Sequence, residues 1–310
     1  MTLAERISEE FLPFVQQPGQ YIGREWNQLV NTGDWERAEV RVAIAFPDTY
    51  SIGMSHLGCQ ILYWLCNHLP GVCAERVYAP WIDAEQVMRQ RGIPLFTWDT
   101  RQRVSEADIL AISLQYELSC GTVLLLLDLA GIPFRAADRQ EHHPLVIAGG
   151  SQVDAPEPYA PFFDLMVMGD GEESMKAIVE LHRRMKREGA SRRDVILEMA
   201  RQFEWIYAPG LYEPEYLPDG TLAGLHPSSA CPTGFVPPAT ISRCQTPNFE
   251  DAAFPTRPLV PYTEVVHDRI GIEIMRGCPQ RCRFCHAGFT KRPLRLRAVD
   301  RIIEIVEQAW

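Results

Sequence analysis

Short apolar runs alternate with amphipathic stretches over the first two thirds of the chain. The run VRVAIAFPD at 40–48 is rich in β-branched residues and closes on Pro47-Asp48, as is typical of a buried parallel strand. Other apolar runs predict further strands at 74–78, 109–114, 144–150 and 164–168. The pattern therefore predicts a parallel sheet.

Helical spacing of the apolar residues separates these strands. Ser55 is a candidate N-cap for a helix whose apolar stripe runs from Leu57 to Leu69 and which ends at Pro70-Gly71. Further helices are predicted at 84–91, at 122–130, after the sequence GDGEES and at 191–203. Because strands alternate with helices, the predicted fold class is α/β, with a doubly wound parallel sheet over residues 39–225.

Loops rich in Gly, Ser and Asp follow several of the predicted strands. The ligand crevice of a doubly wound sheet lies beyond the carboxyl ends of its strands, so these loops are candidates for a binding site. They cover residues 48–58, 113–119, 149–154 and 169–173.

The two ends of the chain have other patterns. Residues 1–38 look helical and polar, and YIGREWN at 21–27 is an aromatic cluster that we expect to lie against the next domain. Residues 205–225 predict a hairpin that turns at Pro218-Asp219-Gly220. From 226 to 261 prolines are dense and periodicity is lost, which predicts a linker.

Residues 262–310 predict one β-loop-α unit. A strand is expected at 270–275, followed by a loop with cysteines and by a helix that begins near Asp300. One face of that helix is expected to carry Ile302, Ile303, Val306 and Trp310.

Composition and charge narrow the function classes. The chain has 310 residues, 46% hydrophobic and 23% charged, which is ordinary for a globular protein of about two domains. Its formal charge of −10 disfavours nucleic acid and anionic membranes as partners. The N-terminus carries acids where a signal peptide is apolar, and no segment reaches the roughly 18 apolar residues of a membrane span, so we expect a cytoplasmic protein.

Nine cysteines in a reducing compartment are not expected to form disulfides. We expect Cys59, Cys66, Cys73 and Cys120 to be small buried hydrophobes. Cys231 and Cys244 lie in the linker, where they are a weak signal for an auxiliary metal site. The remaining three, in the sequence RGCPQRCRFCHAG, are Cys278, Cys282 and Cys285.

Three thiolates with the spacing C-x3-C-x2-C can converge on one metal centre, and thiolate is the soft ligand of zinc and of iron–sulfur clusters. A structural zinc site needs four ligands, and His286 is the available fourth. A 4Fe-4S cluster held by three cysteines leaves one iron open, as a reaction centre requires. The spacing, the preceding strand and the glycine that follows favour the cluster, with zinc as the alternative.

The motif Cys278, Cys282, Phe284, Cys285 resembles the signature of radical S-adenosylmethionine (SAM) enzymes, C-x3-C-x-aromatic-C. The resemblance implies that the open iron binds the amino and carboxylate groups of SAM and cleaves it to methionine and a 5′-deoxyadenosyl radical, with an electron donor such as flavodoxin or ferredoxin. It also implies the start of a partial β/α barrel and places Phe284 beside the cofactor; the simpler interpretation of Phe284 is a core aromatic, and the two are compatible.

The α/β domain resembles the cobalamin-binding domain of one branch of these enzymes. More closely, it resembles an uncharacterised group of radical proteins with such a domain, through YIGREWN, AFPDTYSIGMSHLG, SLQYELS, AGG and GDGEE. The resemblance implies that Ser113, Gly149 and Gly150 lie near the corrinoid or its tail; tight packing of helix on sheet is the alternative. The chain departs from the histidine-ligand pattern D-x-H-x-x-G, because Asp48 and His56 are eight apart. Either a corrinoid binds without a histidine ligand or it has been lost, and we expect His56 to be a surface residue at a helix start.

Two features remain open. The basic run Lys291–Arg297 is either a solvated surface or lies near an anion such as a cofactor carboxylate. His182 lies in the stripe of the helix after GDGEES, where we expect it half-buried and hydrogen-bonded.

The leading function hypothesis is a radical SAM enzyme, or a fragment of one, with an unknown substrate and no assignable catalytic residue. A barrel of around six β/α units would extend past residue 310, so we expect the chain to be truncated. The alternatives are a non-catalytic corrinoid- or iron–sulfur-binding module, such as a sensor or carrier, and a zinc-stabilised interaction protein.

Overall fold

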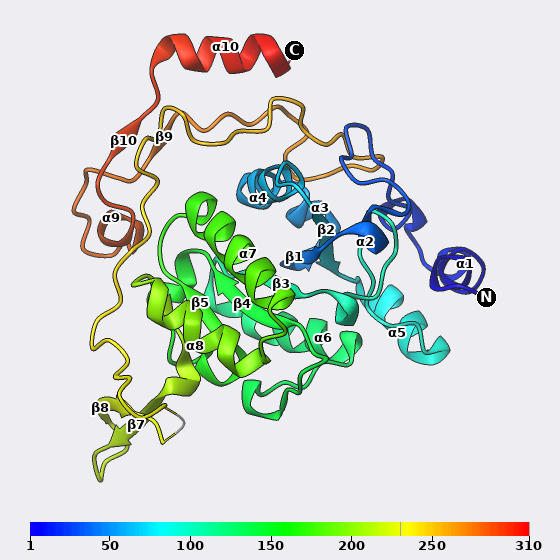
Figure 1. Ribbon diagram of the computed structural model, residues 1–310. Helices are drawn as coiled ribbons and strands as arrows, with labels where there is room; N and C mark the ends of the chain where they lie inside the picture. Colours follow the sequence, from blue (N-terminus) through cyan, green and yellow to red (C-terminus); the bar gives the residue numbers. More distant parts are fainter. Residues whose placement is uncertain (230, 310) are drawn as a thin grey trace.

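A six-stranded sheet forms the centre of the protein in this computed structural model, which describes residues 1–229 and 231–309 (Figure 1). Its strand order is β2-β1-β3-β4-β5-β6, with β1 to β5 parallel and β6 antiparallel at the edge. The α/β prediction is therefore confirmed. The strands are β1 (Val40–Thr49), β2 (Val72–Ala79), β3 (Ile109–Ser113), β4 (Leu145–Gly149), β5 (Leu165–Val167) and β6 (Ile206–Tyr207).

The chain reverses its direction across the sheet between β1 and β3. β1 pairs with β2 on one side and with β3 on the other, so β2 lies on one side of β1 and β3 to β6 lie on the other. In doubly wound sheets ligands bind at such a switch point, at the carboxyl ends of the strands. The register of β3 with β4 sets Ser113 opposite Gly149 at that edge.

Helices cover both faces of the sheet. α4 (Leu57–Asn67) and α7 (Gly171–Arg187) lie side by side on one face and α6 (Cys120–Ala130) lies on the other (Figure 1). α5 (Ile82–Arg91) and α8 (Arg192–Gln202) also form close to their predicted bounds.

The start of α4 differs from the prediction. The short helix α3 (Tyr50–Gly53) precedes it, and the Ser55 hydroxyl donates back to the carbonyl of Ser51 at 2.8 Å. His56 is therefore the N-cap of α4, and its Nδ1 accepts from the backbone N–H of Cys59 at 3.1 Å.

Residues 1–38 form short helical turns rather than long helices. They are α1 (Leu3–Arg6), a π turn (Ile7–Phe11), 3-10 turns (Leu12–Phe14 and Pro18–Gln20) and α2 (Asp34–Arg37). The segment looks polar in sequence, but it buries three apolar side chains: Ile7, Phe11 and Trp35. As expected, the aromatic cluster lies against the α/β domain, since Tyr21 packs beside Trp98.

The predicted hairpin is present, with its turn between β7 (Tyr212–Tyr216) and β8 (Leu222–Pro227). Its expected first residues instead leave the hairpin, because Ile206 and Tyr207 pair with β5 as the edge strand β6.

The C-terminal segment, residues 231–309, wraps around the outside of the α/β domain (Figure 1). The strand expected at 270–275 is reduced to β9 (Met275–Arg276), which pairs antiparallel with the short β10 (Arg295–Leu296). A strand needs a neighbour for its backbone hydrogen bonds, and here the neighbour is two residues long. α9 (Ala287–Thr290) closes the loop between them.

The last helix, α10 (Val299–Ala309), packs through a different residue from those predicted. Ile305 is fully buried against Ile61 and Phe254, while Ile303 and Val306 are exposed. Trp310, which we placed on the apolar face, lies outside the described residues. Within residues 1–229 and 231–309, no helix is both long and apolar enough to cross a membrane.

Candidate functional site

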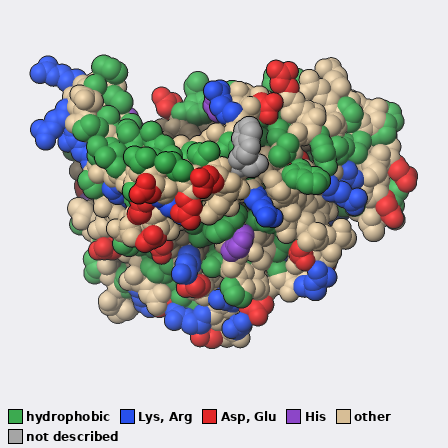
Figure 2. Space-filling view, turned by 90° about the horizontal axis from the view of Figure 1, so that it is seen from above, with side chains coloured by type: hydrophobic (Ala, Val, Ile, Leu, Met, Phe, Trp, Pro, Cys, Tyr) green, Lys and Arg blue, Asp and Glu red, His purple; other side chains and the backbone are tan. Residues whose placement is uncertain are grey.

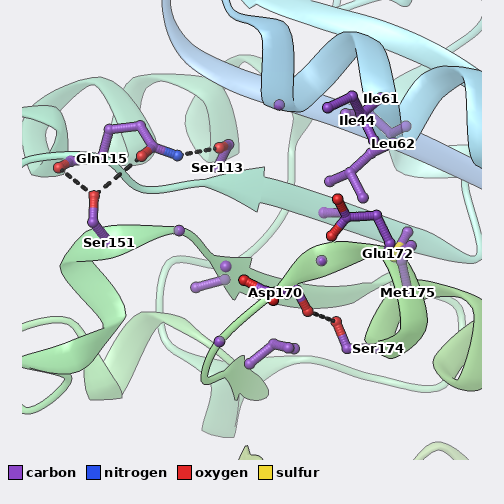
Figure 3. Close-up of a pocket in the computed structure, with 18 of the residues that line it drawn as sticks. Ile44, Ile61, Leu62, Ser113, Gln115, Ser151, Asp170, Glu172, Ser174 and Met175 are labelled. Carbon is purple, nitrogen blue, oxygen red and sulfur yellow. Dashed lines mark hydrogen bonds between the residues drawn. The ribbon is translucent and has the colours of Figure 1, made fainter. Parts of the chain in front are cut away.

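A cavity of about 350 Å³ opens at the carboxyl edge of the sheet, under α4 and α7. Aliphatic side chains form its body, with Ile44, Ile61 and Leu62 together on one side (Figure 3). The other apolar lining residues are Leu57, Ala111, Ile112, Ile147, Ala148, Val167, Met175 and Ile178. The volume lies at the small end of the range for ligand pockets, and the position is the one at which this fold binds ligands.

A chain of hydrogen bonds forms the polar end of the cavity (Figure 3). The Gln115 amide donates to the Ser113 hydroxyl at 2.7 Å, and the Ser151 hydroxyl donates to the Gln115 side-chain oxygen at 3.1 Å. These groups leave spare hydrogen-bonding capacity for a polar part of a ligand.

The predicted residues Ser113, Gly149 and Gly150 all line this cavity. A Cβ at Gly149 would meet no atom within 4 Å, so tight packing does not explain that glycine. Gly150 has a φ of +108°, and a Cβ there would lie 2.3 Å from the carbonyl oxygen of Leu114. The turn after β4 therefore requires a glycine at 150, whereas Gly149 leaves open space.

His56 also lines the cavity, and its ring packs against Phe46 with the ring centres 4.7 Å apart. Burial lowers the pKa of His56 to about 4, so the imidazole is neutral near pH 7. The expectation of a helix-start residue is confirmed, but the residue is half-buried at the cavity rather than on the open surface.

Carboxylates at the start of α7 attach the C-terminal segment to the cavity mouth. Arg276 contacts Glu172 at 2.6 Å and Asp170 at 3.3 Å, and Arg295 contacts Asp170 at 2.5 Å. Although burial raises the pKa of Asp170, the hydrogen bonds from Arg295 and from the Thr246 backbone and the nearby Arg276 charge bring it below its usual range. The GDGEE sequence thus supplies ion pairs to the C-terminal segment.

The basic run is not a solvated surface along its whole length. Arg295 pairs with Asp170, and the buried Arg297 donates to the backbone carbonyls of Glu273 and Glu250. Arg292 lies over the ring of Phe289, and Lys291 lines the cavity. The anions near Arg295 are carboxylates of the protein itself.

Cys278, Cys282 and Cys285 are half-exposed free thiols on the loop between β9 and α9. The Cys285 N–H donates to the carbonyl of Cys282 at 3.1 Å, which makes a tight turn between these two. Gly277, at φ +93°, packs so closely that a Cβ would lie 2.3 Å from the Lys291 carbonyl oxygen. Both ends of the cysteine loop, residues 277–291, therefore lie together.

The donor set suits a cluster in its chemistry, since three thiols lie within one loop. The side chains do not converge: in the described part of the chain no three His, Cys, Asp or Glu are placed to hold a metal ion. The side chain of Phe284 is 92% exposed, so it is not a core aromatic.

The other cysteines divide by burial. Cys59, Cys66 and Cys73 are buried as predicted, and burial raises the pKa of Cys66 to about 12, which keeps its thiol protonated. Cys120 is half-buried, and Cys231 donates to the carbonyl of Leu211 at 3.3 Å. Cys244 is buried beside Gly169.

Two buried polar groups were not predicted correctly from the sequence: one has a different environment from the one expected, and the other was not predicted at all. His182 is 8% exposed, and among the described residues its Nδ1 has no hydrogen-bond partner, so the expectation of a hydrogen-bonded, half-buried histidine is wrong for that atom. Arg76 of β2 is buried between Glu25 and Asp99, each 2.8 Å away. The sequence signal that could have revealed this buried arginine is the charged pair Glu75-Arg76 inside an apolar strand.

Comparison with known proteins gives two findings. Residues 58–209 match the family described as "Radical SAM proteins, N-terminal". An uncharacterized protein of Methanocaldococcus jannaschii is 24% identical over 271 residues, which cover 86% of this chain and 45% of that protein. The chain thus spans less than half the length of this relative, and the cysteine loop lies outside the family match. Over most of the α/β domain, the chain is thus similar to the N-terminal part of radical SAM proteins.

Proposed function

We propose that this chain is the part of a radical SAM enzyme that holds the 4Fe-4S cluster, with Cys278, Cys282 and Cys285 as its ligands. The observation that carries the proposal is the loop itself: three free, half-exposed thiols on one loop, in a chain related to radical SAM proteins. A cluster held in this way supplies the electron for reductive cleavage of SAM.

The residues around the loop have separate tasks in this proposal. The thiols leave their half-exposed positions to ligate, while Arg276 and Arg295, held by Glu172 and Asp170, anchor the two ends of the loop. Phe284 lies next to Cys285 with its ring exposed, so it can pack on a bound cofactor without disturbing the core. An electron donor such as flavodoxin or ferredoxin would reduce the site, and the substrate is open.

The test is anaerobic reconstitution with iron and sulfide, followed by absorption and electron paramagnetic resonance (EPR) spectra with and without SAM. We expect a 4Fe-4S spectrum that SAM perturbs in the wild type and its loss in Cys282→Ala. Cys231→Ala is the matched control, because Cys231 is also half-buried but lies outside the loop.

The outcomes separate the alternatives. Stoichiometric zinc without cluster absorption would favour a zinc-stabilised interaction protein and overturn the proposal. A cluster whose spectrum SAM leaves unchanged would instead favour a non-catalytic iron–sulfur carrier or sensor.

A corrinoid in the α/β domain is a second proposal, supported by the cavity that Ser113, Gly149 and Gly150 line. With about 350 Å³ the cavity would take one part of a corrinoid rather than all of it. Cobalamin absorbance should co-elute with the wild type in gel filtration. Gly149→Leu, whose side chain would grow into open space, should abolish this. Absence of co-elution with the wild type would remove the proposal.

A further inference from the structure

The mouth of the cavity carries one cation with an unusual environment. Lys291 is half-buried there, six residues after Cys285. Two neighbouring cations have carboxylate partners: Arg276 contacts Glu172 and Glu273, and Arg295 contacts Asp170. Lys291, by contrast, makes no ion pair within 4.0 Å in residues 1–229 and 231–309.

The surroundings of Lys291 leave its charge poorly compensated. Removing an ammonium group from water without a counter-ion is costly. Burial accordingly lowers the pKa of Lys291; the Asp154 and Asp170 charges raise this pKa, and the Arg243 and Arg276 charges lower it further. Asp154 is itself paired with Arg243 at 2.5 Å. A ligand anion at this position would therefore gain a charge-assisted contact that the protein does not use.

Three carboxylates also line the cavity, and each is paired with an arginine: Glu172 and Glu273 with Arg276, and Asp170 with Arg295. The remaining lining residues select the other part of such a ligand. The cavity body is aliphatic, from Ile44 on β1 to Met175 and Ile178 on α7, and burial of apolar ligand surface there is favourable. The open space at Gly149 lies in the same cavity.

We propose that the cavity binds an amphiphilic anion, with its apolar body among the aliphatic side chains and its phosphate or carboxylate paired with Lys291. The ligand class shares this chemistry whether its body is an alkyl chain or a flat aromatic ring. The proposal does not depend on the cluster. It goes beyond the corrinoid proposal because it assigns a negative charge to the ligand and names Lys291 as the residue that binds this charge.

Isothermal titration calorimetry on the full chain without a cluster tests the proposal. The probes are octyl phosphate, which has an alkyl body, and 1-naphthyl phosphate, which has an aromatic body. Octanol is the uncharged control for octyl phosphate. We expect at least one phosphate to bind, and Lys291→Met to weaken it about tenfold or more, as for loss of one charged contact. Octanol affinity should not change in this variant.

Three variants define the site. Lys176→Met is the matched control, since Lys176 is an exposed lysine of α7 that does not line the cavity, and it should bind like the wild type. Lys291→Arg keeps the charge and should keep most of the affinity. Gly149→Leu should abolish binding of the phosphates and of octanol, because it fills the cavity.

Several results would overturn the proposal. If the phosphates bind no better than octanol, or if Lys291→Met binds them like the wild type, Lys291 is not the counter-ion. If Gly149→Leu binds normally, the cavity is not the site. Circular dichroism of each variant shows that it is folded, and Cys278→Ala should bind like the wild type, so that a failure of the cluster proposal stays separate.

Discussion

The α/β domain and the C-terminal segment are held in place by different forces. The sheet and its helices share one continuous apolar core, in which strands such as β1 and β4 are almost wholly buried. The C-terminal segment buries few apolar side chains, and many remain exposed. Figure 2, seen from the side of α10, shows hydrophobic side chains gathered on this face. The exposed ones in this segment include Val266, Ile270, Ile274, Met275, Phe284, Phe289, Leu296, Val299, Ile303 and Val306.

This difference teaches which contacts decide where the cysteine loop lies. The ends of the loop are attached through Arg276 and Arg295 to carboxylates of α7 rather than through an apolar core. These largely buried ion pairs hold the loop at a few points rather than over a continuous apolar surface, so they can break without unfolding the domain that they join. We therefore expect the position of the loop and the stability of the sheet to respond to different substitutions.

The largest effect is expected from breaking the buried charges of the α/β domain. Arg76→Met leaves Glu25 and Asp99 buried without their cation, which should lower the free energy of unfolding by about 3–5 kcal/mol. Urea denaturation followed by circular dichroism measures this. Arg89→Met is the control, because its partners Glu85 and Asp128 are on the surface and its loss should cost less than about 1 kcal/mol. Equal costs for the two variants would contradict the assignment.

A smaller effect should separate the two regions. Glu172→Gln removes the charge that holds Arg276 at 2.6 Å, and such a contact contributes about 1–3 kcal/mol. Hydrogen exchange of residues 275–296 should become several-fold faster, while exchange in β1 and β4 stays unchanged. The exposed neighbour Glu173, replaced by Gln, is the control and should leave both regions as they are. Faster exchange throughout the sheet would show that the attachment is not local.

Glu75 makes the α/β domain sensitive to pH. Burial, and next the charge of Asp99, raises the pKa of Glu75 to about 7, against opposing hydrogen bonds from Thr97 and Thr100. A raised pKa means that the folded state binds the proton more tightly, so this contribution to stability is complete below about pH 4.5 and is lost as the pH rises through about 7. Glu75→Gln should flatten that slope, which urea titrations at several pH values measure. An unchanged slope would show that Glu75 is ionised in the folded protein.

The strands were predictable from the sequence because their signal is local. Runs such as 40–48 and 144–150 are apolar over their whole length, as a strand covered by helices on both faces must be. The buried charges were not predictable in the same way, because the partner of Arg76 at Glu25 lies 51 residues away. The position of Glu25 depends on how residues 1–38 pack against the α/β domain.

The same distinction applies to the site. Ser113 and Gly149 could be placed together because parallel strands end at one edge, and their register joins them directly. Lys291 and Arg276 reach the cavity only through the path of the C-terminal segment, and periodicity is lost over residues 226–261, which lead to them. The strand predicted at 270–275 failed for a related reason, since an apolar run shows which residues favour a strand but not whether a partner strand is present.

Phe284 sharpens the comparison through the smallest effect on stability. Its side chain is 92% exposed, so Phe284→Ser should change the free energy of unfolding by less than about 0.5 kcal/mol. Phe254→Ser is the matched control: Phe254 belongs to the same segment but is buried with Ile61 and Ile305, and its loss should cost about 3 kcal/mol or more. If Phe284 packs on a bound cofactor, as proposed, its variant should keep the cluster spectrum and lose the change that SAM causes in it. If the Phe284→Ser variant is as stable as the wild type and its cluster spectrum still responds fully to SAM, Phe284 contributes neither to stability nor to cofactor binding.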